Sequence, residues 1–415
     1  MSAKIIMALS IALIASCGMC MATSGDWSQE DPVLEVYGNA NMDNIIDESD
    51  VVYLQGVING TNAATKLSDA NYDDKIDEND IDWIRQIIQN TERKLTIIDD
   101  SGRTVTINMP IQRIVTLNYR FPEPLVAIGA KAKIAGVEDR FKTRMKDIAE
   151  ACDMMDVPVI GTSDDPDYEK ILESKPDLII AASSTVNEVA QKLPGIPVIG
   201  ISSFISLMDS DHIYYDLRLL GMMTGDSDGA TKLIDFMKGY EDIIEERTKE
   251  LNPDKMPTFY LEGPMNYSIY VPSGSPGKIL AEGCGGRNIA SEIDTSNSSA
   301  EVSPEWVLDK NPDIIIKRDD YLGLDATEDD AKRALAELIN SRTGWDKINA
   351  VKDHRIYLLE GDLMWTPRYL AGRTYLAKWF QPDLFSDFDP EEILSRYHEE
   401  FLGSEYSGIW AYPPK

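Results

Sequence analysis

The stretch Glu169–Ile180, with the sequence EKILESKPDLII, places a short helical segment directly before a strand. Pro176 separates the two, and the apolar run that starts at Leu178 continues to Ala182. This run shows no alternation of polar and apolar residues, which favours a strand that is buried on both faces. Strands of this kind, alternating with helices, are typical of an α/β fold with parallel sheets.

Similar apolar runs occur on both sides of this stretch and form two series. The predicted strands of the first series are Arg113–Leu117, Ile134–Val137, Val159–Gly161, Leu178–Ala182 and Val198–Ile201. Those of the second series are Thr258–Glu262, Ile314–Lys317 and Ile356–Glu360. The sequence therefore predicts two Rossmann-like α/β lobes, over residues 95–225 and 256–405.

Residues 226–252, between the two series, predict one long helix. Apolar side chains recur there at the 3.6-residue spacing of a helix face, and Pro253 ends the pattern. At 1.5 Å per residue the helix would span roughly 38 Å, more than one small lobe needs. We expect a stiff helical bridge between the lobes.

The N-terminus has the features of an export signal. The apolar run Ile5–Ala15 is too short for a membrane span. It ends in Ile14-Ala15-Ser16-Cys17, which resembles a lipoprotein processing box with Cys17 as the lipidated residue. The alternative is ordinary cleavage after Ala22, so residues 1–22 are predicted to be a signal peptide. Either way the chain is expected on the extracellular face of the cytoplasmic membrane.

The charge and the polar residues exclude several classes of function. The formal net charge of −31 leaves no basic footprint for a nucleic acid. No nucleotide-binding loop or esterase motif occurs, so we expect no enzyme. The three histidines, at 212, 354 and 398, form no spaced ligand set, which argues against a receptor for bare Zn²⁺ or Mn²⁺.

An internal repeat with an offset of 30 residues occupies residues 33–92. Each copy places oxygen ligands at positions 1, 3, 5, 7, 9 and 12 of a loop, as Ca²⁺ requires, with position 7 contributing a backbone carbonyl. The predicted ligands are Asn39, Asn41, Asp43, Ile45, Asp47 and Asp50 in the first loop, and Asp69, Asn71, Asp73, Lys75, Asp77 and Asp80 in the second.

Each loop is followed by one apolar helical stretch, Val51–Ile58 or Ile81–Ile88. Position 6, Asn44 or Asp74, is expected to be left-handed. Paired loops with a terminal Asp resemble a dockerin module, a small all-α domain related to the EF-hand. The resemblance implies two bound Ca²⁺ ions and either a cohesin-type partner or a purely structural spacer.

Residues 95–400 resemble the periplasmic-binding family that carries ferric siderophores and vitamin B12. Several segments carry the resemblance in order: Thr96–Ile107, Arg113–Leu117 with Ala127–Ala130, Glu169–Ile180, Cys284–Ile289, Val302–Leu308, Trp345–Val351 and Arg355–Tyr357. The family fold is two α/β lobes joined by one rigid helix. The resemblance implies an ABC-transporter permease as partner, with Glu169 and Glu305 as its docking residues.

The ligand is expected between the lobes, outside the carboxyl ends of the strands. The candidate ligand-binding residues follow those strands: Asn118, Tyr119, Arg120, Arg140, Ser183, Ser184, Thr185, Glu262, Tyr267, Arg318, Trp365 and Arg368. Arginine forks suit anionic chelates, and aromatic rings supply flat walls. The alternative roles are a brace within the lobe for Arg368 and a core position for Trp365.

Three functions stay open at this point. The first is an importer receptor for a ferric siderophore or another anionic metal chelate, which predicts arginines in the cleft. The second is the same receptor carrying a corrinoid, which predicts an apolar, aromatic cleft. The third is a cell-surface scaffold recruited through the dockerin-like module, which predicts no deep cleft.

Overall fold

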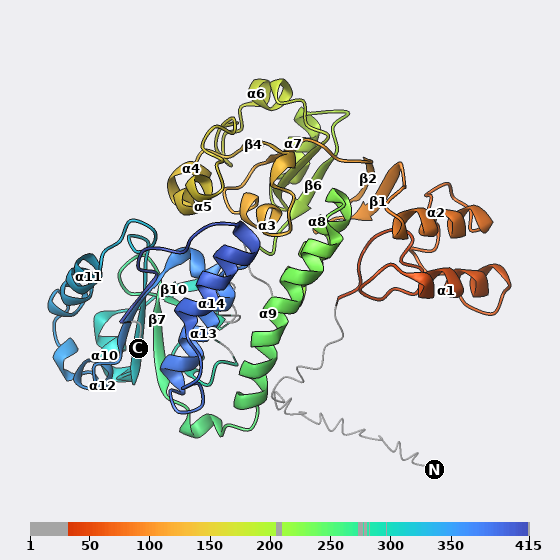
Figure 1. Cartoon of the computed structure of the whole chain (residues 1–415). Coiled ribbons are helices and arrows are strands. Elements are labelled where there is room, and N and C mark those ends of the chain that lie inside the picture. Colours follow the sequence, from red (N-terminus) through yellow and green to blue (C-terminus); the bar gives the residue numbers. More distant parts are fainter. Residues whose placement is uncertain are drawn as a thin grey trace, which may run out of the picture.

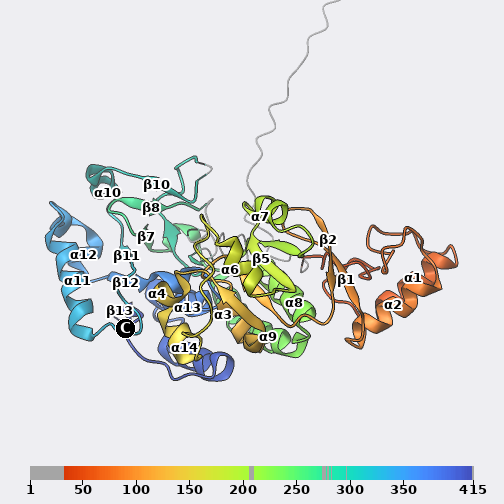
Figure 2. The ribbon, with the colours of Figure 1, turned by 90° about the horizontal axis from the view of Figure 1, so that it is seen from above.

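The computed structural model describes residues 32–204, 210–272, 277, 280, 281, 283–295 and 297–413. The predicted signal peptide, 1–22, and Cys17 lie outside this range. A small two-helix module, an N-terminal lobe and a C-terminal lobe follow one another along the chain, and Figures 1 and 2 show the module at the end of the molecule away from the C-terminal lobe. Within the described residues, no helix is long and apolar enough to cross a membrane.

The module consists of two loop–helix units with the same local structure. Helix α1 (Glu48–Ile58) begins after Asp47 and helix α2 (Glu78–Ile88) after Asp77, and each cap carboxylate accepts a hydrogen bond from the first turn of its helix. Apolar side chains from both units fill the space between them: Ala40, Val51, Leu54, Ala70, Ile81 and Ile84.

The module continues into the next domain without a free linker. Its entry segment pairs with strand β1 (Lys94–Ile98), which forms a hairpin with β2 (Thr104–Asn108). Val36 bridges Ile97, and the amide of Ile98 donates to the carbonyl of Glu35 at 2.8 Å. Leu34 and Val36 are buried in the same apolar core as the hairpin. The module is therefore built onto the N-terminal lobe.

The N-terminal lobe contains a four-stranded parallel sheet in the order β4-β3-β5-β6. Its strands are β3 (Ile114–Thr116), β4 (Ile134–Val137), β5 (Leu178–Ala182) and β6 (Val198–Ile201). Its helices are α3 (Pro122–Ala127), α4 (Phe141–Arg144), α5 (Lys146–Ala151), α6 (Tyr168–Glu173) and α7 (Val186–Lys192). The strand predicted at Val159–Gly161 is wrong, because that segment makes two isolated bridges, Val159 with Val137 and Gly161 with Pro166, and no regular strand.

The bridging helix is α9 (Ser227–Thr248), with 22 residues. It pairs with α8 (Ser210–Thr224), which comes just before it. Tyr214 of α8 hydrogen-bonds to Glu241 of α9, and Gly221 lies so close to Ala230 that a Cβ there would clash. Tyr369 of the C-terminal lobe also donates to Glu241, at 2.7 Å. The bridge is thus packed against both lobes (Figure 1).

The C-terminal lobe contains a seven-stranded mixed sheet in the order β10-β8-β7-β11-β12-β13, with β9 beside β7. The strands are β7 (Thr258–Glu262), β8 (Ser268–Tyr270), β9 (Arg287–Asn288), β10 (Ser299–Glu301), β11 (Ile314–Asp319), β12 (Ile356–Glu360) and β13 (Ala411–Tyr412). The pairs β7–β8, β8–β10 and β12–β13 are antiparallel, so the expectation of a Rossmann-like parallel lobe holds for β7, β9, β11 and β12 but not for β8, β10 and β13.

Helices of the C-terminal lobe cover this sheet and reach back to the N-terminal lobe. They are α10 (Pro304–Lys310), α11 (Glu328–Asn340), α12 (Asn349–Lys352), α13 (Tyr369–Phe380) and α14 (Pro390–Tyr397). The segment His398–Leu402 continues α14, and the Leu402 carbonyl accepts a hydrogen bond from the thiol of Cys152 at 3.4 Å. The lobes therefore meet through α9 and again through the end of α14.

Candidate functional site

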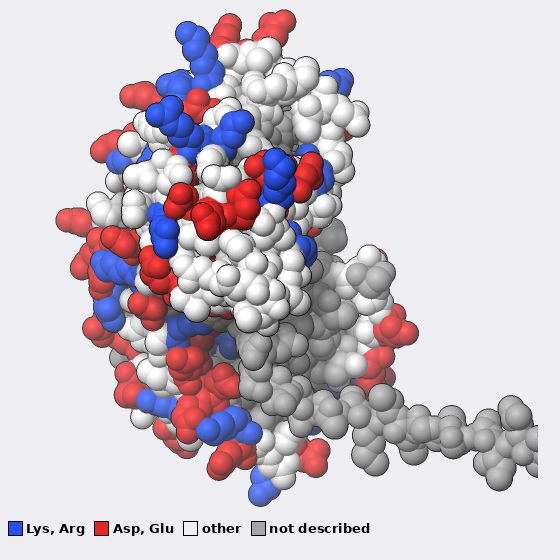
Figure 3. Space-filling model, turned by 90° about the vertical axis from the view of Figure 1, so that its right-hand side faces the viewer, with Lys and Arg blue, Asp and Glu red and all other residues white. Residues whose placement is uncertain are grey.

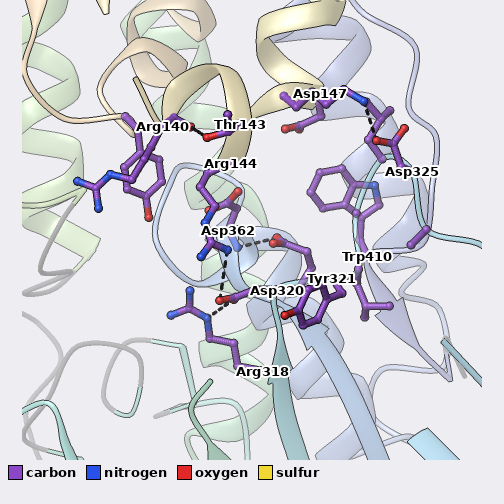
Figure 4. Close-up of a pocket in the computed structure, with 17 residues that line it drawn as sticks. Arg140, Thr143, Arg144, Asp147, Arg318, Asp320, Tyr321, Asp325, Asp362 and Trp410 are labelled. Atoms are coloured by element: carbon purple, nitrogen blue, oxygen red, sulfur yellow. Dashed lines mark hydrogen bonds and ion pairs between the residues drawn. The ribbon is translucent and has the colours of Figure 1, made fainter. Parts of the chain in front are cut away.

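A cavity of about 510 Å³ lies between the two lobes. The N-terminal lobe lines it with Tyr119, Arg140, Thr143, Arg144, Lys146 and Asp147. The C-terminal lobe lines it with Arg318, Asp320, Tyr321, Leu322, Gly323, Leu324, Asp325, Ala326, Glu360, Asp362 and Trp410. Figure 4 shows these side chains converging from both lobes. Charged and aromatic groups make up most of the lining, so the cavity suits a polar ligand with a flat face.

Tyr119 lies between two guanidinium groups on the N-terminal side of the cavity. The Cζ atom of Arg120 is 4.5 Å from the centre of the Tyr119 ring, and that of Arg140 is 5.1 Å from it. Both arginines follow parallel strands, Arg120 after β3 and Arg140 after β4. Because these strands are neighbours, their carboxyl ends bring the three side chains together.

Arg120 is buried and forms no ion pair within 4 Å among the described residues, although the charge of Asp362 is near enough to act on it. Its guanidinium lies over the rings of Tyr119 and Trp365, at 4.5 and 4.9 Å, and its Nε atom has no hydrogen-bond acceptor. Burial lowers the pKa of this guanidinium, because removal from water penalises the charged form. The buried Nε1 of Trp365 also has no acceptor in the described structure. This corner of the site can therefore gain from an anion or another acceptor.

Arg318 is the main cation on the C-terminal side. It lies near the end of the central strand β11, where its Nε donates to Asp320 Oδ1 at 2.6 Å and its Nη1 to the Tyr270 hydroxyl at 3.1 Å. Although burial opposes the charge, Tyr270 and Asp320 together raise the pKa of Arg318. Arg318 is thus a fixed positive group at the cavity wall.

Two acidic groups at the end of β12, Glu360 and Asp362, lie beside these cations. Burial raises the pKa of both carboxyl groups. The negative charge of Asp362 raises the pKa of Glu360 further, and that of Asp147 raises the pKa of Asp362. The nearby Arg368 opposes this shift in both. The pair therefore carries less negative charge than two ordinary carboxylates would.

Two ion pairs connect the lobes across the cavity. Lys146 Nζ of the N-terminal lobe is 2.7 Å from Asp325 Oδ2, and Arg144 Nη1 is 3.6 Å from Asp320 Oδ2. The four side chains keep between a fifth and three quarters of their surface exposed, so water screens both pairs. They can open and re-form at little cost when a ligand enters.

Two of the predicted ligand-binding residues do not line the cavity, because buried ion pairs hold their side chains elsewhere. Arg368 is buried and contacts Glu123 and Asp147 of the N-terminal lobe at 3.1 and 2.6 Å. Glu262 is fully buried and binds both Nη atoms of Arg342, at 3.0 and 3.1 Å. Arg368 is the brace that the sequence left as an alternative, and it joins the two lobes.

The other predicted residues fall into two groups. Tyr119, Arg140 and Arg318 line the cavity, and Arg120 and Trp365 contact each other behind Tyr119. The remaining ones do not line it: Asn118, Ser183, Ser184, Thr185 and Tyr267. Asn118 accepts a hydrogen bond from the amide of Arg120 and so shapes the loop, and Tyr267 stacks on Arg342.

Sequence reasoning missed several lining residues for identifiable reasons. Asp320 and Tyr321 come directly after β11, and Asp362 comes just after β12, so the strand-end rule could have found them. Arg144 and Lys146 lie in short helices after β4. Trp410 comes from the C-terminal segment beside β13, and no pattern in the sequence places it at the cavity.

Comparison with known proteins agrees with this architecture. The family model described as periplasmic binding protein matches residues 114–363, which is more than half of the chain. The chain belongs to the periplasmic binding protein family. Its members are solute-binding proteins, and both lobes of the fold and the cavity between them fall within or next to the matched region.

Individual relatives of this periplasmic binding protein match a longer part of the chain, which includes most of both lobes. The uncharacterized ABC transporter substrate-binding lipoprotein YvrC of Bacillus subtilis is 26% identical over 71% of this chain and 87% of its own. The molybdate-binding protein MolA of Haemophilus influenzae is 25% identical over 75% of this chain and 91% of its own. The crystal structure of the TroA-like periplasmic binding protein FepB of Veillonella parvula is 27% identical, with a TM-score of 0.67, over 76% of this chain and 98% of its own.

The two predicted docking carboxylates of this periplasmic binding protein occupy equivalent positions in the two lobes. Glu169 lies in the first turn of α6, which leads into β5, and Glu305 lies in the first turn of α10, which leads into β11. Both residues are exposed. Within the described residues neither makes an ion pair, so both carboxylates can meet a partner.

The two predicted calcium loops have nearly the same hydrogen bonds. The amides of Asn41 and Asn71 donate to the carboxylates of Asp50 and Asp80, each at 3.1 Å. The loops lie in the module, whose side of the molecule shows acidic side chains next to uncharged surface (Figure 3). The left-handed residues are Met42 and Tyr72 at position 4 and Asp74 at position 6, so the expectation for position 6 holds for Asp74 but not for Asn44.

Proposed function

We propose that this protein is the extracytoplasmic substrate-binding component of an ABC importer and that it binds an anionic metal chelate, such as a ferric siderophore. The observation that carries the proposal is Arg120. Its buried guanidinium lies between the rings of Tyr119 and Trp365, its Nε has no hydrogen-bond acceptor, and it forms no direct ion pair in the described structure. An anionic ligand would supply both the acceptor and the ion pair.

The surroundings of Arg120 support a bulky anion with a flat face. Arg140 and Arg318 add two further guanidinium groups, one from each lobe, and planar forks of this kind match carboxylate, hydroxamate or catecholate oxygens. The raised pKa values of Glu360 and Asp362 reduce the negative charge nearby. The relative from Haemophilus influenzae is named for molybdate, which is also an anion.

The two alternative functions fit the cavity less well. A corrinoid favours an apolar, aromatic cleft, whereas charged side chains predominate here. A scaffold subunit needs no deep cleft, whereas the cavity here is large enough for a small ligand. Both alternatives remain outcomes of the binding experiment described below.

Delivery to the permease would use one carboxylate on each lobe. Glu169 and Glu305 are exposed, and ion pairs of such groups contribute only about 0–1 kcal/mol each. Docking through them would orient the protein and remain reversible. We also propose that the chain is exported and held at the outer face of the membrane through Cys17, as the lipoprotein name of the Bacillus relative suggests.

We further propose that the N-terminal module is dockerin-like and binds two Ca²⁺ ions. The donor set consists of oxygen atoms, and the buried Oδ1 of Asn71, at ligand position 3, has no hydrogen-bond partner in the described structure. Burial raises the pKa of Asp50 to about 6, so a bound cation would favour the charged form of this carboxyl group. A cohesin-type partner for this module is part of the same proposal.

The ligand proposal is tested by titrating the purified mature protein with three compounds and measuring the quenching of its tryptophan fluorescence. The compounds are a ferric catecholate, a ferric hydroxamate and cobalamin. We expect binding to a ferric chelate, and loss of about tenfold or more in affinity for Arg120→Met, because a charged hydrogen bond contributes about 1.5–3 kcal/mol. The matched control is Arg333→Met, an arginine on the exposed face of α11.

Three results would contradict the proposal. Binding to cobalamin alone would support the corrinoid receptor. Binding to none of the three compounds would favour the scaffold function. Equal binding by wild type and Arg120→Met would show that the anion, if bound, is not held by this arginine.

A further inference from the structure

A second group of possible metal ligands lies on the N-terminal lobe, away from the cavity. Asp100 comes just after β1, in its turn to β2, and His212 and Asp216 lie four residues apart on α8. One ligand atom of each side chain lies within 4.8 Å of the others. Residues at i and i+4 share a helix face, so α8 presents His212 and Asp216 together toward the turn that carries Asp100.

Neighbouring groups hold the two carboxylates in place. Asp100 Oδ2 accepts hydrogen bonds from the amide and hydroxyl of Ser202, at 2.7 and 2.6 Å, and lies 3.3 Å from His212 Nε2. The hydroxyl of Ser203 donates to Asp216 Oδ2. Both serines come directly after β6. Hydrogen bonds of this kind orient metal ligands in proteins.

The cluster places two carboxyl groups side by side with little access to water. Asp216 is fully buried, and its Oδ1 accepts no hydrogen bond from the part of the chain that the structure describes. The side chain of Asp100 is 5% exposed. Two adjacent buried carboxylates are costly unless a cation compensates them, and His212 supplies at most one positive charge.

We propose that Asp100, His212 and Asp216 form a binding site for one resident divalent transition-metal ion, of the Zn²⁺ or Co²⁺ class. One imidazole with two carboxylate oxygens is a donor set that these ions accept, whereas Ca²⁺ prefers oxygen ligands alone. The side chain of His212 is 26% exposed, which leaves a route for the ion and room for a water ligand.

This site is separate from the two sites described above. None of its three residues lines the cavity between the lobes, and none belongs to the calcium loops. The ion would link the turn between β1 and β2 to α8. It would thereby stabilise the hairpin that pairs with the N-terminal module. Its role would be structural, and the proposal does not depend on the identity of the transported ligand.

The test uses the purified mature protein, stripped of metal and then titrated with Co²⁺ in the presence of millimolar Ca²⁺ to occupy the loops. We expect visible Co²⁺ absorption bands that saturate at one equivalent, together with a rise in melting temperature. Asp216→Asn and His212→Asn should lose both signals. His354→Asn is the matched control, because His354 is exposed and has a positive φ that asparagine tolerates.

Asp216→Asn also keeps the test interpretable if His212→Asn unfolds. An amide at a buried position removes the charge, so the metal-stripped variant should be at least as stable as the wild type. The proposal is overturned if the wild type gives no absorption bands and no shift in melting temperature, because Asp216 then holds a proton in place of a metal. It is also overturned if either site variant keeps the one-equivalent signal, or if His354→Asn loses it.

Discussion

Arg368, just before α13 in the C-terminal lobe, donates to Glu123 of α3 in the N-terminal lobe, and both side chains are completely buried. Asp147 contacts the same guanidinium at 2.6 Å, and the Tyr397 hydroxyl donates to Glu123 at 2.9 Å. This buried network joins the lobes near α9, whereas the Lys146–Asp325 and Arg144–Asp320 ion pairs across the cavity are partly exposed to water. Ligand entry should therefore open the lobes on the cavity side and leave the network intact.

Arg368→Met should destabilise the protein strongly. The change leaves Glu123 and Asp147 buried without their cation, which typically costs about 3–5 kcal/mol. Urea unfolding followed by circular dichroism measures the free energy of unfolding. Arg333→Met should leave it nearly unchanged, because the Arg333–Asp330 pair is exposed. Equal midpoints of urea unfolding for Arg368→Met and Arg333→Met would show that the buried network around Arg368 does not stabilise the fold.

The same arginine shows what sequence reasoning could and could not predict. The strand-end rule selected Tyr119, Arg140 and Arg318, which line the cavity, because each position depends on a nearby strand. It failed for Arg368 and Glu262, because their partners Glu123 and Arg342 are 245 and 80 residues away in the chain. His212 and Asp216 show helical spacing in the sequence, but their third neighbour, Asp100, becomes visible only in the fold.

Glu169→Ala and Glu305→Ala should uncouple binding from transport. Both side chains are exposed on outer helices and do not line the cavity, so ligand affinity should not change. Uptake of the labelled ferric chelate by cells should fall strongly, and furthest in the double variant. Glu173→Ala, another exposed glutamate on α6, is the control. Normal uptake by the double variant would rule out these two residues as the contact with the permease.

The two calcium loops should differ in affinity. The second loop supplies four carboxylates, from Asp69, Asp73, Asp77 and Asp80, whereas Asn39 replaces the first of these in the other loop. Because more charged ligands favour Ca²⁺, calorimetric titration should resolve a tighter and a weaker site. Asp73→Asn should weaken the tighter one, and Asp82→Asn, outside the loops, should change neither. Two identical sites in the wild type would contradict this asymmetry.

Without calcium, the stability of the module should fall as the pH rises. Burial raises the pKa of Asp50 from 3.8 to about 6 in the folded protein, so the folded state binds more protons than the unfolded state between these values. The contribution of Asp50 to stability is then complete below pH 3.8 and is lost as the pH rises through about 6.

The measurement is the melting temperature in a chelator at several pH values across this range. Asp50→Asn should reduce the decline, because an amide does not ionise. Saturating calcium should also reduce it, because the ion stabilises the charged carboxylate. If the melting temperature of Asp50→Asn falls with pH as much as that of the wild type, other groups cause the pH dependence.

The ion pair between Lys146 and Asp325 should influence the rate of ligand association more than the stability of the fold. Both side chains are partly exposed at the cavity, where charged rim groups mainly change the association rate and its dependence on salt. Stopped-flow quenching of Lys146→Ala at low and high salt measures both quantities. Lys332→Ala, in a pair exposed on α11, is the control. Identical association rates for both variants would mean that the pair does not affect ligand entry.

The backbone pairing between Val36 and Ile97 has a consequence for dissecting the molecule. Residues 92–94 do not form a flexible linker that a protease could cut, because strand β1 starts at Lys94. Deleting the first 92 residues would leave one edge of the hairpin unpaired and would expose the apolar side chains of the hairpin to water. The module and the two lobes would therefore not fold independently of each other. The protein should be expressed with its N-terminal module in place.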